Sequence, residues 1–262
     1  MSNALILIIF GVASYFVGNI NWALIISKLK KSDIREMGSG NPGTLNMSRN
    51  FGLKLGLLTF FLDILKGAIP TLVAYFAMKG RYFYMSNFPV NEFGIYLCGF
   101  CAVLGHIYPM LLKFRGGKGI ASTIGVFLVT ESVHGWEWAV IAIMALVAAG
   151  LFIYFTEFGA MGSFIAITPP AVASSIRLFL WFGRDNLVNG IALYVITNMF
   201  VFAICLITWF AHRKNIERML SGDEHPTSIK TMVVKMKMKK QQKLQENSSN
   251  SENLTNNNEE NA

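Results

Sequence analysis

Two short segments of the chain combine glycines with cationic side chains. Residues 38–43 read Gly-Ser-Gly-Asn-Pro-Gly and lead to Arg49, and residues 113–119 read Lys-Phe-Arg-Gly-Gly-Lys-Gly. Glycine lets backbone N–H groups approach an anion closely, while arginine and lysine supply the opposite charge. Each segment therefore has the composition of a turn that binds phosphate.

The first segment can surround a phosphate without a metal ion. Its glycines allow a tight turn with exposed amides, and Ser39 adds a hydroxyl donor. We expect Asn41 and Asn46 to hold carbonyl groups of the loop itself, and Arg49 to offer a bidentate fork. The alternative is a glycine-rich connector whose cations only set membrane topology. The residues expected to contact phosphate here are Gly38, Gly40, Asn41, Gly43, Thr44 and Asn46.

The second segment carries more cations than topology requires. Lys113, Arg115 and Lys118 surround a pair of glycines within a few residues. His106 lies just before them, near the end of an apolar run, where we expect a packed and hydrogen-bonded helix residue that supports the site. Lys113 and Arg115 are expected to play a similar supporting part. The residues expected to contact phosphate are Gly116, Gly117 and Gly119.

An acidic and a basic residue share one face of a predicted membrane helix. Asp63 and Lys66 are three residues apart within an apolar run, so they can neutralise each other. An ionisable pair at such a place is a functional candidate, and we expect it to support the site. A structural ion pair that locks two helices explains the spacing equally well. In a later run, the tandem prolines at 169–170 are expected to break or kink the helix.

Composition indicates a membrane protein. Of 262 residues, 53% are hydrophobic and only 15% are charged, so a soluble fold would have more apolar side chain than its core could bury. The net charge of +8 would suggest nucleic acid in a soluble chain, but here the cations concentrate in a few loops and in the tail. Anionic lipid headgroups or phosphorylated substrates are the expected partners, and nucleic acid is not. The three cysteines lie in apolar runs without a nearby histidine or carboxylate, so neither a metal site nor a disulfide is expected.

Apolar runs predict an all-α, polytopic helical bundle. With seven spans, the N-terminus lies outside and the C-terminus in the cytosol, because every cluster of lysine and arginine then faces the cytosol. The fourth run is shorter than a membrane crossing needs. A five-span version, with two weaker segments re-entrant or interfacial, keeps the same sidedness. The expected spans are residues 5–26, 53–77, 93–112, 120–130, 138–155, 159–176 and 190–211.

The C-terminal part changes in composition twice. Residues 212–224 resemble a short amphipathic helix and complete a membrane-embedded domain of residues 1–224. A tail of residues 225–262 follows, with a basic run at 230–243 that either lies on anionic lipid or is simply solvated. The last residues, rich in asparagine and glutamate, are too polar to fold alone.

Three motifs, in order, closely resemble the PlsY family of bacterial glycerol-3-phosphate acyltransferases, which use acyl phosphate. They occupy residues 32–49, 105–119 and 212–224, and Asp63-x-x-Lys66-Gly67 accompanies them. The resemblance implies an enzyme of the bacterial plasma membrane, with its active site facing the cytosol and no cofactor. It would move a fatty acyl group from acyl phosphate to the sn-1 hydroxyl of glycerol-3-phosphate, giving lysophosphatidic acid and phosphate in the first acylation of phospholipid synthesis. By motif, the catalytic residues would be Ser39, Arg49, Lys118, His212 and Asn215.

The sequence departs from the family pattern at several places. Residues 18–21, Gly-Asn-Ile-Asn, replace the usual Ser-Ile-Pro, which affects the shape of the first span near the cytosol. Where the family often has two serines, Ala160 takes the first place, so only Ser163 is a candidate for binding substrate. Glu224, which ends the third motif, is expected to support the site.

Two other readings of the sequence compete with an enzyme. A phosphate or organic-anion transporter would also need cationic, glycine-rich turns, but transporters place binding groups near the membrane midplane and show internal repeats. Here the candidates cluster at one surface and the sequence has no evident repeat. The other reading is a scaffold that recruits lipid enzymes through its basic tail. We expect an enzyme.

Overall fold

Helices are the regular secondary structure of the described part of the chain, and loops and turns connect them. A computed structural model describes residues 1–84, 86–182, 190–223, 227, 229–234 and 238. Within these residues the only extended pairing is one isolated bridge, between Tyr82 and Pro89. The predicted all-α fold class is therefore confirmed. The helices are α1 (Asn3–Asn19), α2 (Trp22–Leu29), η1 (Ile34–Glu36), α3 (Thr44–Phe51), α4 (Leu53–Met78), α5 (Val90–Ile107), η2 (Met110–Leu112), α6 (Ile120–Ser132), α7 (Trp136–Thr156), α8 (Gly159–Phe182), α9 (Ile191–Ala211) and α10 (Arg213–Leu220).

Contacts divide the chain into a unit of Met1–Thr227, which holds all of these helices, and a unit of Ser228–Ala262. In the second unit only residues 229–234 and 238 are described. The affinity of the basic tail for lipid stays a prediction.

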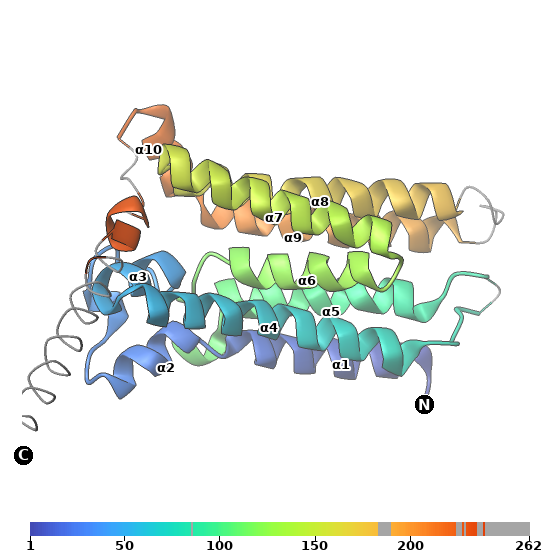
Figure 1. Ribbon diagram of the computed structural model, residues 1–262. Helices are drawn as coiled ribbons and strands as arrows, with labels where there is room; N and C mark the ends of the chain where they lie inside the picture. The colour runs from blue at the N-terminus through green and yellow to red at the C-terminus, as the bar shows by residue number, and fades with distance from the viewer. Residues whose placement is uncertain (85, 183–189, 224–226, 228, 235–237, 239–262) are drawn as a thin grey trace, which may run out of the picture. The chain divides into compact units, whose positions relative to one another are not determined.

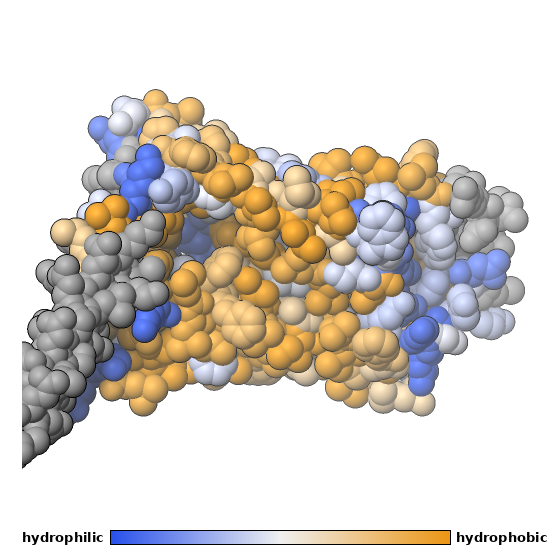
Figure 2. Space-filling view, in the orientation of Figure 1, coloured by the Kyte–Doolittle hydropathy of each residue, from blue (hydrophilic) through white to orange (hydrophobic). Residues whose placement is uncertain are grey.

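Among the described residues, six helical runs, all in the first unit, are long and apolar enough to cross a membrane. Together with α6, which lies between the third and fourth of them along the chain, they alternate in direction (Figure 1). At 13 residues α6 is about 20 Å long, which is less than the roughly 30 Å hydrocarbon layer. Apolar side chains cover the middle of the molecule, and hydrophilic ones gather toward the ends (Figure 2). The runs are Asn3–Leu29, Leu53–Met78, Val90–Leu112, Trp136–Thr156, Gly159–Trp181 and Ile191–Ala211.

The first predicted span is not one straight helix. It divides into α1 and α2 at Ile20, because the Asn21 side chain accepts a hydrogen bond from the Leu24 amide (3.0 Å) and starts a new helix. The break frees the Ile20 carbonyl from the helical pattern. The Lys66 ammonium donates to this carbonyl at 2.8 Å, so a side chain from α4 satisfies the exposed backbone group.

The tandem prolines do not break the sixth predicted span. Helix α8 continues through Pro169 and Pro170 and ends at Phe182, although proline removes an intrahelical donor. Each proline leaves one backbone carbonyl without its helical N–H partner. A full break would leave many more backbone groups unpaired in the hydrocarbon, so the continuous helix is favoured. The prediction of a break at residues 169–170 was therefore wrong, whereas the alternative, a kink in the helix, stays a prediction.

Close packing fixes α6 in the interior. A Cβ atom at Gly67 of α4 would lie 2.0 Å from the Ser122 carbonyl oxygen, and one at Gly125 of α6 would lie 2.1 Å from the Ile64 carbonyl oxygen. Only glycine allows the two backbones to approach this closely. On its other side α6 adds Ile124 and Phe127 to a core that α5, α8 and α9 share. Neighbouring helices thus hold α6 on two of its sides.

Candidate functional site

The second glycine segment folds back onto the end of α5. The Gly116 amide donates to the Ile107 carbonyl and the Gly117 amide donates to the His106 carbonyl, both at 3.2 Å. A Cβ atom at Gly117 would lie 2.3 Å from the His106 ring nitrogen Nε2, so the site has no room for a side chain. These two amides therefore cap α5, and the same turn fixes Lys118 at the start of α6.

Lys118, His212 and Asn215 lie together. The Lys118 ammonium donates to the side-chain oxygen of Asn215, which lies in the first turn of α10. His212 joins α9 to α10 and is only 4% exposed. A hydrogen bond of 3.1 Å between the Thr123 and Thr208 hydroxyls holds α6 against α9 beside this group. Three residues from two distant motifs thus form one polar cluster.

His212 is held as a neutral base. Burial, and to a smaller extent the charge of Lys118, lower its pKa to about 4. Its Nδ1 lies 2.9 Å from the Thr208 carbonyl oxygen, which can only accept, so Nδ1 carries the proton and Nε2 presents a lone pair. The Phe164 ring packs edge-on against the imidazole, with the ring centroids 5.7 Å apart. The histidine is therefore set to accept a hydrogen bond.

The first glycine segment is organised by a buried asparagine. The Asn46 amide nitrogen donates to the carbonyls of Ile34 (3.1 Å) and Met37 (2.9 Å), and its oxygen accepts from the Ser39 amide (3.1 Å). This confirms that Asn46 holds the loop's own carbonyls. Gly38 and Gly40 have φ of +56° and +69°, a region that side chains disfavour. Ser39 lies on the exposed surface of this turn.

The other predicted residues of this end lie around the α7–α8 turn. Arg49 is on the last turn of α3, and its Nε donates to the Thr227 carbonyl at 3.4 Å. The Thr227 amide in turn donates to the Glu157 carbonyl at 3.0 Å. Ser163, in the first turn of α8, donates to the Gly159 carbonyl at 2.8 Å. Glu224 lies outside the described residues.

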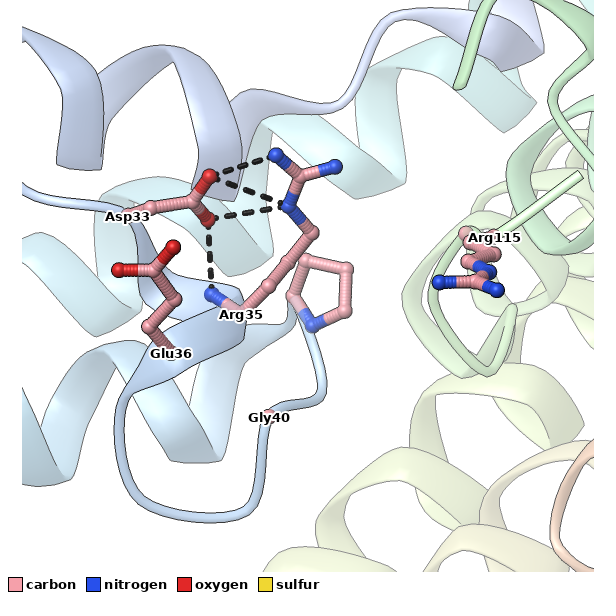
Figure 3. Close-up of a pocket in the computed structure, with 7 residues that line it drawn as sticks. Asp33, Arg35, Glu36, Gly40 and Arg115 are labelled. Carbon is pink, nitrogen blue, oxygen red and sulfur yellow. Dashed lines mark hydrogen bonds and ion pairs between the residues drawn. The ribbon is translucent and has the colours of Figure 1, made fainter. Parts of the chain in front are cut away.

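The two glycine segments meet around a pocket of about 340 Å³ (Figure 3). The Pro42 carbonyl lies 3.2 Å from the position that a Cβ atom would take at Gly117. Asp33 and Arg35 form a forked ion pair on one wall, and Arg115 comes from the facing segment (Figure 3). Hydrogen bonds from Arg35 lower the pKa of Asp33 to about 2, so this pair is charged throughout the physiological range. The pocket is lined by Asp33, Arg35, Glu36, Gly40, Pro42, Arg115 and Gly116.

Sequence reasoning gave no role to four of these lining residues, which are Asp33, Arg35, Glu36 and Pro42. Asp33 and Arg35 belong to the first of the three motifs, residues 32–49, and their spacing of two was the available signal for an ion pair. Glu36 gave no such signal. Of the predicted residues, Gly40, Arg115 and Gly116 line this pocket, whereas Lys118, His212 and Asn215 form the separate cluster described above.

Two of the helices that begin at this end, α3 and α6, have a glycine at the N-cap and lie next to the candidate residues. Gly43 precedes α3, and Gly119, with φ of +87°, precedes α6 directly after Lys118. Glycine has no side chain to cap the helix, so first-turn N–H groups remain available to a ligand. The positive end of the helix dipole adds to the charge of Lys118. The arrangement suits a phosphate group.

A buried polar cluster lies beneath the Lys118 turn. The Lys66 ammonium is 2.8 Å from Asp63 Oδ1, as the spacing predicted, and both side chains are almost fully buried. His106 Nδ1 lies 3.9 Å from the same carboxylate oxygen and 3.3 Å from the Ser122 hydroxyl. The prediction of a packed, hydrogen-bonded His106 is confirmed. The cluster connects the break between α1 and α2 with the turn that carries Lys118.

The chain resembles one group of proteins along most of its length. A family model described as glycerol-3-phosphate acyltransferase matches residues 8–222. The glycerol-3-phosphate acyltransferase of Aquifex aeolicus is 35% identical over 223 residues, which cover 85% of this chain and 98% of the relative. That of Desulfotalea psychrophila is 37% identical over 217 residues, covering 82% and 95%.

Solved structures give the same result. The crystal structure of PlsY, an integral membrane glycerol 3-phosphate acyltransferase, in its glycerol 3-phosphate form has a TM-score of 0.64 and 30% identity, and the match covers 84% of this chain and 94% of that one. The lysophosphatidic acid form has a TM-score of 0.62 and 31% identity, covering 86% and 95%.

Proposed function

Because the chain belongs to the glycerol-3-phosphate acyltransferase family, we propose that it transfers a fatty acyl group from acyl phosphate to the sn-1 hydroxyl of glycerol-3-phosphate. The products are lysophosphatidic acid and inorganic phosphate. The observation that carries the proposal is the cluster of Lys118, His212 and Asn215 at the open N-terminus of α6. This cluster offers a cation, a neutral base and helix amides to a phosphorylated substrate.

The reaction brings two negatively charged substrates together. In the proposed site, Lys118 and the first turn of α6 bind one phosphate, and Arg49 and the first turn of α3 bind the other. Ser39 and the first glycine segment complete the donor side, and Ser163 lies on the acyl side. Holding both phosphates in fixed positions replaces an improbable encounter of like charges with a preorganised one. The same cations and amides stabilise the oxyanion that develops at the acyl carbonyl.

Proton transfer needs no ionised histidine. The hydroxyl of glycerol-3-phosphate attacks the acyl carbonyl carbon, the bond from that carbon to the donor's phosphate oxygen breaks, and the departing phosphate takes the hydroxyl proton. In this scheme, Nε2 of neutral His212 accepts a hydrogen bond from the glycerol part and orients the hydroxyl. Asn215 keeps the Lys118 ammonium in place.

The short length of α6 suits a substrate with one polar and one apolar end. Since α6 is about 10 Å shorter than the hydrocarbon layer, its N-terminus can lie below the membrane surface. The donor phosphate, bound by Arg49 and the first glycine segment, then lies close to the glycerol-3-phosphate at Lys118, while the acyl chain stays among the spans. We place the enzyme in the bacterial plasma membrane with this end toward the cytosol, where its basic loops favour that orientation.

Phosphate release tests the proposal. Purified full-length protein is mixed with palmitoyl phosphate and glycerol-3-phosphate, and both inorganic phosphate and lysophosphatidic acid are measured. We expect equal amounts of the two products, no product without glycerol-3-phosphate, and none when palmitoyl-CoA replaces the acyl phosphate. Turnover with palmitoyl-CoA alone would show a different donor. Protein that is folded but inactive with both donors would refute the acyltransferase assignment for this chain.

A further inference from the structure

A second surface at the same end of the molecule is both cationic and apolar. One half of the surface is α2 and the turn after α2. The other half is η2 and the turn after η2. Leu29 is 79% exposed, Leu111 68% and Phe114 60%, and Lys28, Lys31 and Lys113 are exposed among them. We call these six residues the α2–η2 surface: Lys28, Leu29, Lys31, Leu111, Lys113 and Phe114.

The two halves of the α2–η2 surface are held together by specific hydrogen bonds. The Tyr15 hydroxyl donates to the Tyr108 carbonyl (2.7 Å) and accepts from the Met110 amide (3.1 Å). The Asn19 side-chain oxygen accepts from the Leu111 amide at 3.3 Å. Beneath the surface, Leu112 packs in one cluster with apolar residues of α2. The end of α1 thus fixes η2 beside α2.

Backbone strain is concentrated on the α2–η2 surface. Among the described residues, four that are not glycine have positive φ, and three of these four belong to the surface: Lys31 (+58°), Lys113 (+54°) and Phe114 (+59°). Lysine and phenylalanine disfavour this left-handed region, whereas glycine adopts it freely. Retaining large side chains at strained positions indicates that the side chains themselves are needed.

We propose that the α2–η2 surface binds the headgroup layer of anionic lipids in the surrounding leaflet. The lysines bind lipid phosphates, and Leu29, Leu111 and Phe114 insert between the headgroups into the acyl boundary. Free phosphate would explain the lysines but not three large apolar side chains exposed beside them. Nearby acidic residues do not cancel the positive charge of the lysines. Asp33 is already paired with Arg35, so Glu36 on η1 is the other exposed acidic side chain to consider there. The proposal does not depend on the catalytic assignment.

Spin-labelled lipids can measure this preference directly. The full-length protein is reconstituted in phosphatidylcholine bilayers with a trace of spin-labelled phosphatidylglycerol or spin-labelled phosphatidylcholine, and electron spin resonance gives their relative association with the protein. The test variant is Lys28→Gln/Lys31→Gln/Lys113→Gln. The control is Lys79→Gln/Arg81→Gln, which removes cations at the opposite end. The basic tail contributes the same background to every variant.

We expect wild type and control to prefer phosphatidylglycerol equally, and the triple variant to lose about twofold or more of that preference. Adding 0.5 M NaCl should reduce the difference, since exposed charges are screened. A triple variant with wild-type preference, or a control that loses as much, would overturn the proposal.

A glycine pair separates lipid binding from a structural role. Lys31→Gly/Lys113→Gly relieves two strained residues, so the melting temperature should be unchanged or higher while the preference for phosphatidylglycerol falls. A lower melting temperature with intact preference would show that these lysines serve the fold, and the proposal would be wrong.

Discussion

The two ends of the helix bundle each hold a buried charged cluster, and the clusters differ in what they contact. At the end with the glycine segments, Lys66 bridges Asp63 and the Ile20 carbonyl, and His106 lies against Gly117. At the opposite end, side chains of α5, α6 and α8 and of the turn after α6 bind one another. The members of this second cluster are Glu92, Tyr96, Glu131, His134, Ser174 and Arg177.

The second cluster holds helices α5, α6 and α8 together. Arg177 of α8 donates to the Tyr96 hydroxyl (2.9 Å) and to Glu92 (3.3 Å), both on α5. Ser174 of the same helix donates to Glu131 of α6. None of these contacts reaches a loop of the candidate site. The first cluster, in contrast, supports irregular backbone on both sides. A buried charged cluster thus holds helices together at one end and supports the Lys118 turn of the candidate site at the other.

The largest effect should follow from removing the candidate site's own cation. Lys118→Ala should lower turnover by about two to three orders of magnitude, because a charge that stabilises the transition state is lost. Arg49→Ala should act similarly. Both variants should keep the wild-type melting temperature in detergent. The assay is phosphate release from acyl phosphate with glycerol-3-phosphate.

A matched control for Lys118 is Lys54→Ala. Lys54 is an exposed lysine in the first turn of α4, at the same end but outside the proposed site. It should retain wild-type turnover. If Lys118→Ala were as active as Lys54→Ala, the proposed pocket would be wrong.

The sequence predicted local features of this end well. Its motifs identified the PlsY family, which the family match confirms, and the spacing of Asp63 and Lys66 predicted their ion pair. The second hydrogen-bond partner of Lys66, the Ile20 carbonyl, could not be predicted. This carbonyl becomes available only because Asn21 starts a new helix. The amides of Gly116 and Gly117 were expected to face phosphate, and instead donate to α5.

The cluster at the opposite end was not predicted at all. Glu92, Glu131 and Arg177 are each isolated in the sequence, and only the packing of α5, α6 and α8 brings them together. No spacing rule links residues that lie about 40 or 80 positions apart. Helical periodicity predicts which residues share a face, whereas long-range pairing depends on how the helices are arranged.

Paired substitutions test whether the two clusters differ in role. Lys66→Met and Arg177→Met each leave a buried carboxylate without its cation, so each should destabilise the fold by about 3 kcal/mol or more. The double variants Asp63→Asn/Lys66→Met and Glu92→Gln/Arg177→Met remove both charges and should recover most of that stability. Melting temperatures in detergent measure this part.

Turnover then separates the clusters. The double variant at the Glu92 end should regain wild-type turnover along with its stability. The double variant at the Asp63 end should remain about tenfold slower, because the Lys118 turn has lost its support and a small displacement of a substrate-binding group is costly. The loss should appear in kcat and in the KM for glycerol-3-phosphate. If this variant recovered full turnover, Asp63 and Lys66 would only hold the fold together, as the other cluster does.

The smallest effect concerns the protonation of His212. Its pKa is about 4 when folded, against about 6.5 for a histidine in an unfolded chain, so below pH 6.5 the unfolded chain binds a proton that the folded chain excludes. The free energy of unfolding should therefore fall by about 2 kcal/mol between pH 7 and pH 5 from this group, and the loss should level off below pH 4.

His212→Gln should lack this part of the pH dependence, and Lys118→Met should show less of it, because a neighbouring cation that lowers the histidine pKa is gone. Melting temperatures at pH 7 and pH 5 give the comparison, with His134→Gln as the matched variant at the opposite end. A wild-type protein and a His212→Gln variant with equal pH dependence would mean that His212 titrates normally, and the neutral hydrogen-bond acceptor assigned to it would be lost.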